Sequence, residues 1–103
     1  MGNSVKGTEF KLNLHMQKCD GYSLKDVDFY VEVFTDRGGL VKIDKSECKE
    51  VDEDNFLVGV DSSKTGVGKY FVRLTAYIPD GDFPDGIRTE KKSIPTGITI
   101  ESR

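Results

Sequence analysis

The sequence predicts an all-β fold, a sandwich or small barrel of about seven strands. Its composition is one reason: Val, Ile, Thr, Tyr and Phe, which favour strands, total 33, whereas Ala, Leu, Met and Gln, which favour helices, total 10. Its periodicity is another, because apolar and polar residues alternate through most of the 103 positions, as in strands with one buried face. Turn signals also recur every ~8–12 residues, the spacing typical of such folds.

The N-terminal half contains three predicted strands. Residues 8–16 alternate between apolar and polar side chains, and the Asp20-Gly21 pair that follows is typical of a turn. Residues 27–35 alternate in the same way. The two glycines at 38 and 39 allow the positive φ angles of a hairpin turn, so residues 40–43 are predicted to return as a short strand.

The next stretch of the chain is less regular. Residues 44–54 are polar and acidic, which predicts a connector with a short edge strand at residues 47–51. Residues 55–61 alternate again, and residues 62–68, rich in Gly and Ser, predict a loop. Residues 69–78 form the longest predicted strand, because five apolar residues occupy every second position from Tyr70 onward.

The C-terminal quarter predicts a hairpin. Residues 79–86 hold two Pro and two Gly and are predicted to form its long tip. Residues 87–93 then read as an edge or return strand, and residues 94–100 as the closing strand. The whole chain, residues 1–103, is predicted to be one β-sandwich domain. Within it, residues 1–6 contain no apolar signal-peptide region and are expected to be disordered or in part left over from the expression vector.

Charge and hydropathy exclude two classes of partner. The chain carries 15 basic and 18 acidic residues, a net charge of −3, and its longest basic run is Lys91-Lys92. Nucleic-acid binding requires a basic stripe that releases counterions, so we expect no nucleic acid as a partner. No apolar run approaches the ~20 residues of a membrane span, so we expect no membrane partner either.

Few residues could carry nucleophilic chemistry. Cys19 and Cys48 lack the CxxC spacing of zinc and redox sites, so we predict two free, partly buried thiols of a cytosolic protein, although one internal bridge also fits the count. His15 is the only histidine, and it falls on the exposed face of residues 8–16 with no serine or cysteine placed beside it. We therefore expect no enzyme activity and no cofactor.

Three carboxylates in the predicted hairpin tip are the best metal-ligand candidates. Asp80, Asp82 and Asp85 are spaced so that a loop can bring them around a hard cation such as Ca²⁺. An EF-hand is excluded, because Pro84 stands in place of the third ligand and Lys91 in place of the bidentate glutamate. The simpler interpretation is a solvated turn in which Asp, Gly and Pro serve the backbone, so we predict no metal site.

Aromatic residues occur on strand faces that the alternation assigns to solvent. Tyr30 and Phe34 alternate with the apolar residues of 27–35, and Phe71 and Tyr77 do so in 69–78. One interpretation is an interaction surface for a protein or a sugar. The other is that long loops cover these faces.

The order of features along the chain resembles that of one known group. The matching segments are Lys6-Gly7-Thr8-Glu9-Phe10, Gly21-Tyr22-Ser23-Leu24 before the strand that ends near Phe34, Val58-Gly59-Val60-Asp61 leading to Thr65-Gly66-Val67-Gly68-Lys69-Tyr70, and Thr96-Gly97-Ile98-Thr99-Ile100. Together they span residues 6–100 and are similar to the immunoglobulin-like N-terminal domain of phage baseplate upper proteins and to related structural proteins of prophages and mobile elements. The chain departs from that pattern in its extended tip at residues 79–86, and it has no Trp for the Cys–Trp–Cys pattern of antibody domains.

The resemblance implies a single immunoglobulin-like β-sandwich of about seven mostly antiparallel strands. It also implies a non-enzymatic structural or assembly module of a phage tail, baseplate or prophage-derived particle. Its partners would be other structural proteins or copies of itself in a homo-oligomer, and it would be cytoplasmic during synthesis and virion-associated afterwards. The alternative is a cell-surface or secreted glycan-binding module that uses the exposed aromatic residues and the acidic loop.

Overall fold

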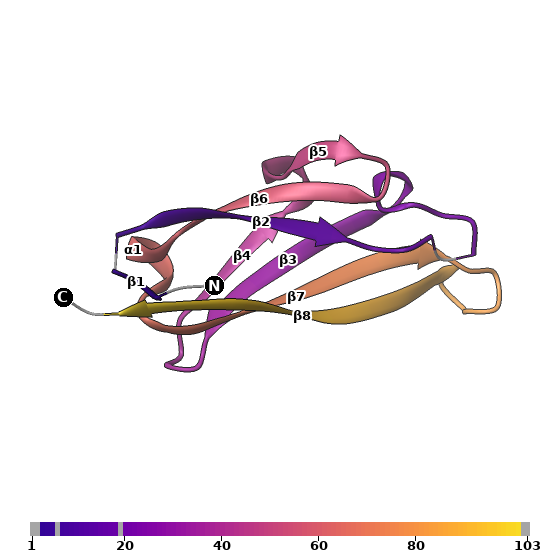
Figure 1. Ribbon diagram of the computed structural model, residues 1–103. Coiled ribbons are helices and arrows are strands. Elements are labelled where there is room, and N and C mark those ends of the chain that lie inside the picture. The colour runs from indigo at the N-terminus through magenta and orange to yellow at the C-terminus, as the bar shows by residue number, and fades with distance from the viewer. Residues whose placement is uncertain (1–2, 6, 19, 102–103) are drawn as a thin grey trace.

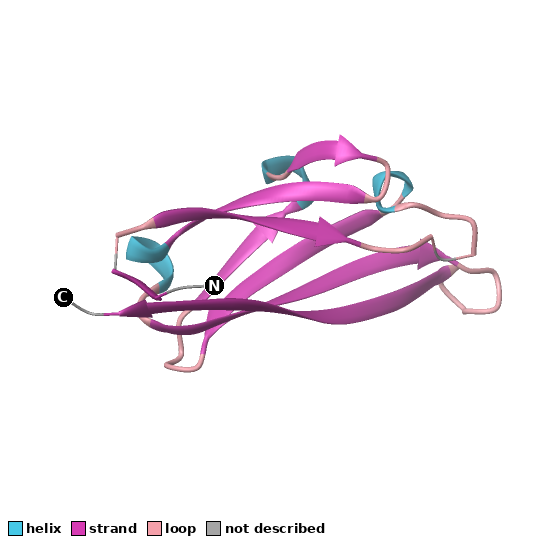
Figure 2. Ribbon diagram, viewed as in Figure 1, coloured by secondary structure: helices cyan, strands magenta, loops and turns pink. Residues whose placement is uncertain are grey.

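The computed structural model describes residues 3–5, 7–18 and 20–101, and it confirms the all-β sandwich. Figures 1 and 2 show two layers of strands with short helical turns at their ends. The elements are β1 (Asn3–Val5), β2 (Glu9–His15), η1 (Leu24–Asp26), β3 (Asp28–Thr35), β4 (Leu40–Asp44), η2 (Lys45–Glu47), β5 (Lys49–Asp52), β6 (Asn55–Asp61), α1 (Ser62–Thr65), β7 (Gly68–Pro79) and β8 (Ile87–Glu101).

The strand order is that of an immunoglobulin-like sandwich. One sheet has the order β1-β8-β7-β3-β4, and the other has the order β2-β6-β5. All pairs are antiparallel except β1 with β8. In immunoglobulin terms, β8, β7, β3 and β4 take the places of strands G, F, C and C′, and β2, β6 and β5 take those of B, E and D.

The core lies between the inner faces of the two sheets. Val31 and Val33 of β3 and Leu14 of β2 are fully buried in one continuous apolar cluster. Aromatic contacts cross from sheet to sheet: Phe29 meets Phe56 edge-on at 5.1 Å, and Phe10 meets Tyr70 at 5.4 Å between ring centroids. Packing of aromatic and branched side chains therefore joins the sheets where antibody domains use a disulfide and a Trp.

The connection from β6 to β7 is a tyrosine corner. Tyr70, near the start of β7, donates its hydroxyl hydrogen bond to the Gly66 carbonyl, four residues upstream. The sequence predicted only a loop here, but the structure contains α1, whose first turn is capped by the Asp61 carboxylate accepting from the Ser63 amide at 2.9 Å. The helix ends at Gly66, which has φ +98°. This is the corner geometry that immunoglobulin-like sandwiches place before strand F.

Two stretches differ from the prediction at the ends of the chain. Residues 3–5 form β1, although no regular structure was expected there. They form a strand because they pair in parallel with Thr99–Glu101 of β8. Residues 87–101 form one continuous strand rather than two. The predicted boundary between Ser93 and Ile94 is absent, because these residues pair consecutively with Arg73 and Val72 of β7. The register shifts only further on, between Lys69 and Phe71 of β7, at a bulge that does not end the strand.

Candidate functional site

The outer face of the five-stranded sheet is the candidate functional site. The structure places all four predicted aromatic residues on it: Tyr30 and Phe34 from β3, and Phe71 and Tyr77 from β7. Each alternates with a fully buried residue, because successive side chains of a strand point to opposite faces. All four remain partly exposed, and Phe71 retains 37% of its surface.

The aromatic rings are paired across the two central strands. Phe34 lies directly opposite Phe71 in the register, and their rings stack with centroids 5.6 Å apart. Tyr30 and Tyr77 make a tilted pair at 6.2 Å. Because each ring is held by its neighbour, the face is ordered before any partner binds.

Cations from three strands lie over these rings. The Arg73 guanidinium is 5.2 Å from the Phe34 centroid and 3.5 Å from the Glu32 carboxylate. Lys42 lies 4.5 Å and Lys91 6.0 Å from the Tyr30 ring. The sequence prediction missed these residues, although each occupies an outward position of an alternating strand.

The side chains of this face form transverse rows, because β4, β3 and β7 pair in register and β8 continues that register from Phe71 of β7 onward. The apolar row is Leu40, Phe34, Phe71 and Pro95. The central row is Lys42, Glu32, Arg73 and Ser93. The third row is Asp44, Tyr30, Thr75 and Lys91. Leu40 is 60% exposed, so the apolar row is open to solvent.

A groove of about 690 Å³ adjoins the third row at the end of β4. Its lining combines two tyrosines with charged residues: Asp28, Phe29, Tyr30, Lys42, Asp44, Lys45, Ser46, Cys48, Glu50, Phe56 and Tyr77. Lys45 is anchored there, since its ammonium donates to the Val27 carbonyl at 2.6 Å.

Cys48 is a free, partly buried thiol, as predicted, and its hydrogen bond goes to the Asp44 carbonyl. Burial, helped by the nearby charges of Glu47 and Asp44, raises the pKa of the Cys48 thiol to about 11. The thiol is therefore protonated at neutral pH and is a poor nucleophile. Cys19 lies outside the described residues.

Two of the three carboxylates in the hairpin tip bind backbone amides, and one of them also pairs with an arginine. Asp80 accepts from the Asp82 amide at 3.0 Å and pairs with Arg88 at 2.8 Å, while Asp85 accepts from the Ile87 amide at 3.1 Å. Within the described residues, no group of three His, Cys, Asp or Glu side chains is arranged to hold a metal ion. The carboxylates of Asp80 and Asp85 thus serve the turn, whereas Asp82 contributes its backbone amide to it.

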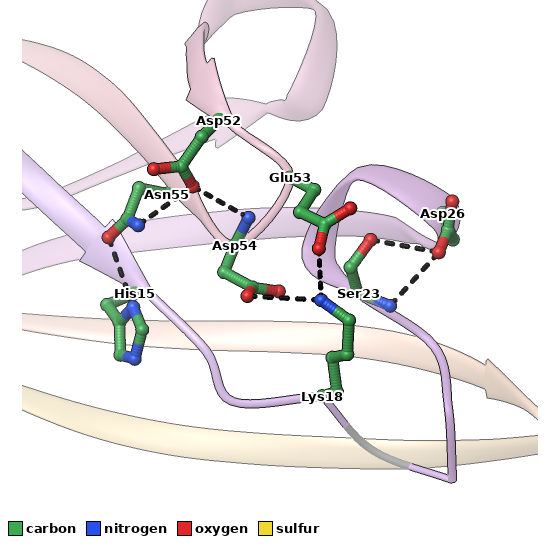
Figure 3. Close-up of polar contacts among 8 residues, drawn as sticks. All are labelled: His15, Lys18, Ser23, Asp26, Asp52, Glu53, Asp54 and Asn55. Atoms are coloured by element: carbon green, nitrogen blue, oxygen red, sulfur yellow. Dashed lines mark hydrogen bonds and ion pairs between the residues drawn. The ribbon is translucent and has the colours of Figure 1, made fainter.

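His15 lies in a polar network at the β5–β6 turn (Figure 3). Its Nδ1 is 3.1 Å from Oδ1 of Asn55, whose amide group donates to the Asp52 carboxylate at 2.8 Å. Nearby, the Lys18 ammonium bridges the carboxylates of Glu53 and Asp54. These contacts fasten the turn to the end of β2, and they join His15 to an asparagine rather than to a serine or cysteine.

Comparison of the chain with protein-family models, curated proteins and solved structures gives no match. No helix in the described part of the chain has the length and apolar character needed to cross a membrane. The functional interpretation therefore rests on the outer face and on the groove beside it.

Proposed function

We propose that the chain is a non-enzymatic structural or assembly module that acts through protein–protein contacts on the outer face of the five-stranded sheet. The observation that carries this proposal is the apolar row, which extends across four strands and includes Leu40 at 60% and Phe71 at 37% exposure. Exposed apolar side chains that adjoin one another across several strands are typical of interaction sites.

The composition of the face supports a protein partner. Aromatic residues and arginine are enriched in protein interfaces, and here Tyr30, Phe34, Phe71, Tyr77 and Arg73 lie together. Their rings are already paired, so binding would cost little side-chain ordering.

The setting we propose is a phage tail, baseplate or prophage-derived particle. Its support is the resemblance of features over residues 6–100 and the immunoglobulin-like sandwich that accompanies it. The partners would be other structural proteins of the particle or further copies of the chain, and the protein would pass from the cytoplasm into the particle.

The test is affinity capture with matched surface variants, from the cells in which the chain is naturally made. Leu40→Glu and Phe71→Glu place a charge in the apolar row. The control, Val51→Glu, places the same charge at a similarly exposed position of β5, in the other sheet. We expect the wild type and Val51→Glu to retain the same partners and the two outer-face variants to lose them. Identical capture by all four proteins would refute the proposal.

Glycan binding is a second candidate function, which the groove favours. Its lining places the rings of Tyr30 and Tyr77 beside the carboxylates of Asp28, Asp44 and Glu50, and stacking rings with carboxylate acceptors suit a sugar. The acidic loop at residues 80–85 does not contribute to this lining. Binding on a glycan array that is lost in Tyr30→Ala, with the fold intact, would favour this function, and no binding at millimolar sugar would exclude it.

A further inference from the structure

We propose that the outer face binds the same face of a second copy of this chain. A two-fold axis relates the two copies; it lies in the interface between them and runs parallel to the strands, over the boundary between β3 and β7. This inference rests on the proposed function and names its partner. It comes from the arrangement of charge on the four strands.

The outer face is electrically balanced although the chain is not. The whole chain has a net charge of −3, which makes copies repel one another. From the apolar row to the row of Asp28, Tyr77 and Thr89, the outer face carries three cations and three carboxylates: Lys42, Arg73, Lys91, Asp28, Glu32 and Asp44. Two copies can therefore approach through this face without an excess of like charge.

The proposed axis turns this balance into complementary pairs. Rotation about it exchanges β4 with β8 and β3 with β7, so each row meets the same row of the second copy in reverse order. In the central row, Glu32 then faces Arg73 of the second copy. In the third row, Asp44 faces Lys91, and Lys91 faces Asp44. Each of these contacts occurs twice, as an isologous interface requires.

The apolar row meets itself under the same rotation. Leu40 faces Pro95 of the second copy, and Phe34 faces Phe71. An axis perpendicular to the strands would instead place the apolar row against the row that holds Asp28, Tyr77 and Thr89. That arrangement would bury a carboxylate against phenyl rings, which is costly. The sequence of rows therefore selects the axis along the strands.

The size of the face is sufficient for a weak dimer. The eight residues of β3 span about 26 Å and four strands span about 19 Å, so the face covers about 500 Å² per copy and about 1,000 Å² in the pair. Specific interfaces begin near ~1,000 Å² of total buried surface. A face of this minimal size suits a weak interface, so association is to be tested at concentrations of about 10 µM to 1 mM.

The decisive test uses two charge-reversed variants, Asp44→Lys and Lys91→Asp. Within one chain these residues lie on β4 and β8, three strand spacings or about 14 Å apart, so their pairing can occur only between copies. In sedimentation equilibrium, each variant alone should dimerise at least about tenfold more weakly than the wild type, because it repels its own kind twice. An equimolar mixture of the two variants should regain wild-type affinity, because both pairs are restored in the heterodimer.

Asp44 also caps η2, so thermal melts monitor the fold of both variants. Phe71→Glu, with Val51→Glu as the matched control, gives a second readout that does not involve the cap. Loss of the dimer in Phe71→Glu alone supports the inference. A wild type that stays monomeric at about 1 mM, or a mixture no stronger than its components, would overturn it.

The outcomes also separate this inference from the proposed function. If the wild type is monomeric but the outer-face variants still lose a captured partner, the second copy is the wrong partner and the interaction surface stands. If the wild type is monomeric and capture is unaffected by the variants, both fail.

Discussion

Tyr70→Phe tests the tyrosine corner in isolation. The side chain is 2% exposed, and its hydroxyl donates to the Gly66 carbonyl. Phenylalanine keeps the ring and its edge-on contact with Phe10, centred 5.4 Å away, so the substitution removes one hydrogen bond and little else.

The expected loss follows from that single bond. A buried hydrogen bond contributes about 0.5–1.5 kcal/mol net, and an acceptor left without a donor costs about 1–3 kcal/mol. Gly66 is half-buried, so water replaces the donor in part, and we expect a loss of about 1.5 kcal/mol in the free energy of unfolding. For a domain of this length, that lowers Tm by about 6–12 °C.

Urea titration followed by circular dichroism, together with a thermal melt, measures both quantities. Tyr22→Phe is the matched control, because Tyr22 is 36% exposed and should tolerate the change within about 0.5 kcal/mol. If Tyr70→Phe also stayed within that range, the corner would not stabilise the β6–β7 connection and our account of it would be wrong.

Three further predictions concern stability and reactivity. Gly39→Ala should lower the free energy of unfolding by about 1–3 kcal/mol, because the new Cβ would lie 1.9 Å from the Thr65 carbonyl oxygen. In the same urea titration, Gly59→Ala should raise it by about 0.4–1 kcal/mol, because its Cβ would meet nothing within 4 Å. Hydrogen bonds from Ser23, Asn55 and Ser63 lower the pKa values of Asp26, Asp52 and Asp61 below their ordinary 3.8. The stability that these carboxylates contribute is present above pH 3.8 and is lost as pH falls through the folded pKa values. The urea midpoint should therefore decrease as the pH is lowered below about 4, and a midpoint independent of pH there would contradict this. In a Cys19→Ser background, Cys48 should react with a disulfide reagent at pH 8 about 100-fold more slowly in the folded protein than in the unfolded protein, because folding raises its pKa from 9.0 to about 11. Equal rates in the two states would refute the burial of this thiol.

The sequence predicts the central strands well because their pattern is local. Residues 55–61 coincide with β6, and residues 27–35 differ from β3 by one residue at the start, since in both a buried face alternates with a polar one. The continuity of β8 escapes prediction, because residues 87–93 are mostly polar whereas residues 94–100 alternate, so the two stretches read as separate strands. Only the distant pairing with β7 shows that the strand continues.

Non-local pairing also limits prediction of β1 and of the candidate site. Residues 3–5 carry no alternation, and their partner lies at Thr99–Glu101 at the other end of the chain. The alternation assigns the four aromatic residues to outward positions, but they lie together on one face only because β3 and β7 are adjacent strands. Lys42 and Lys91 join them only through the registers of β4 and β8. Likewise, Asp80 turns toward Arg88 because of hairpin geometry that its spacing from Asp82 does not contain.

The most direct test of the interaction surface is a dilution series followed by nuclear magnetic resonance. Amide shifts of the isotope-labelled chain would be recorded from about 1 mM down to about 10 µM. Concentration-dependent shifts should gather on the outward residues of β3, β4, β7 and β8, including Tyr30, Phe34, Phe71 and Lys91, while β2, β5 and β6 stay unchanged. Shifts confined to β2, β5 and β6, or none at any concentration, would contradict the assignment of this face to a second copy.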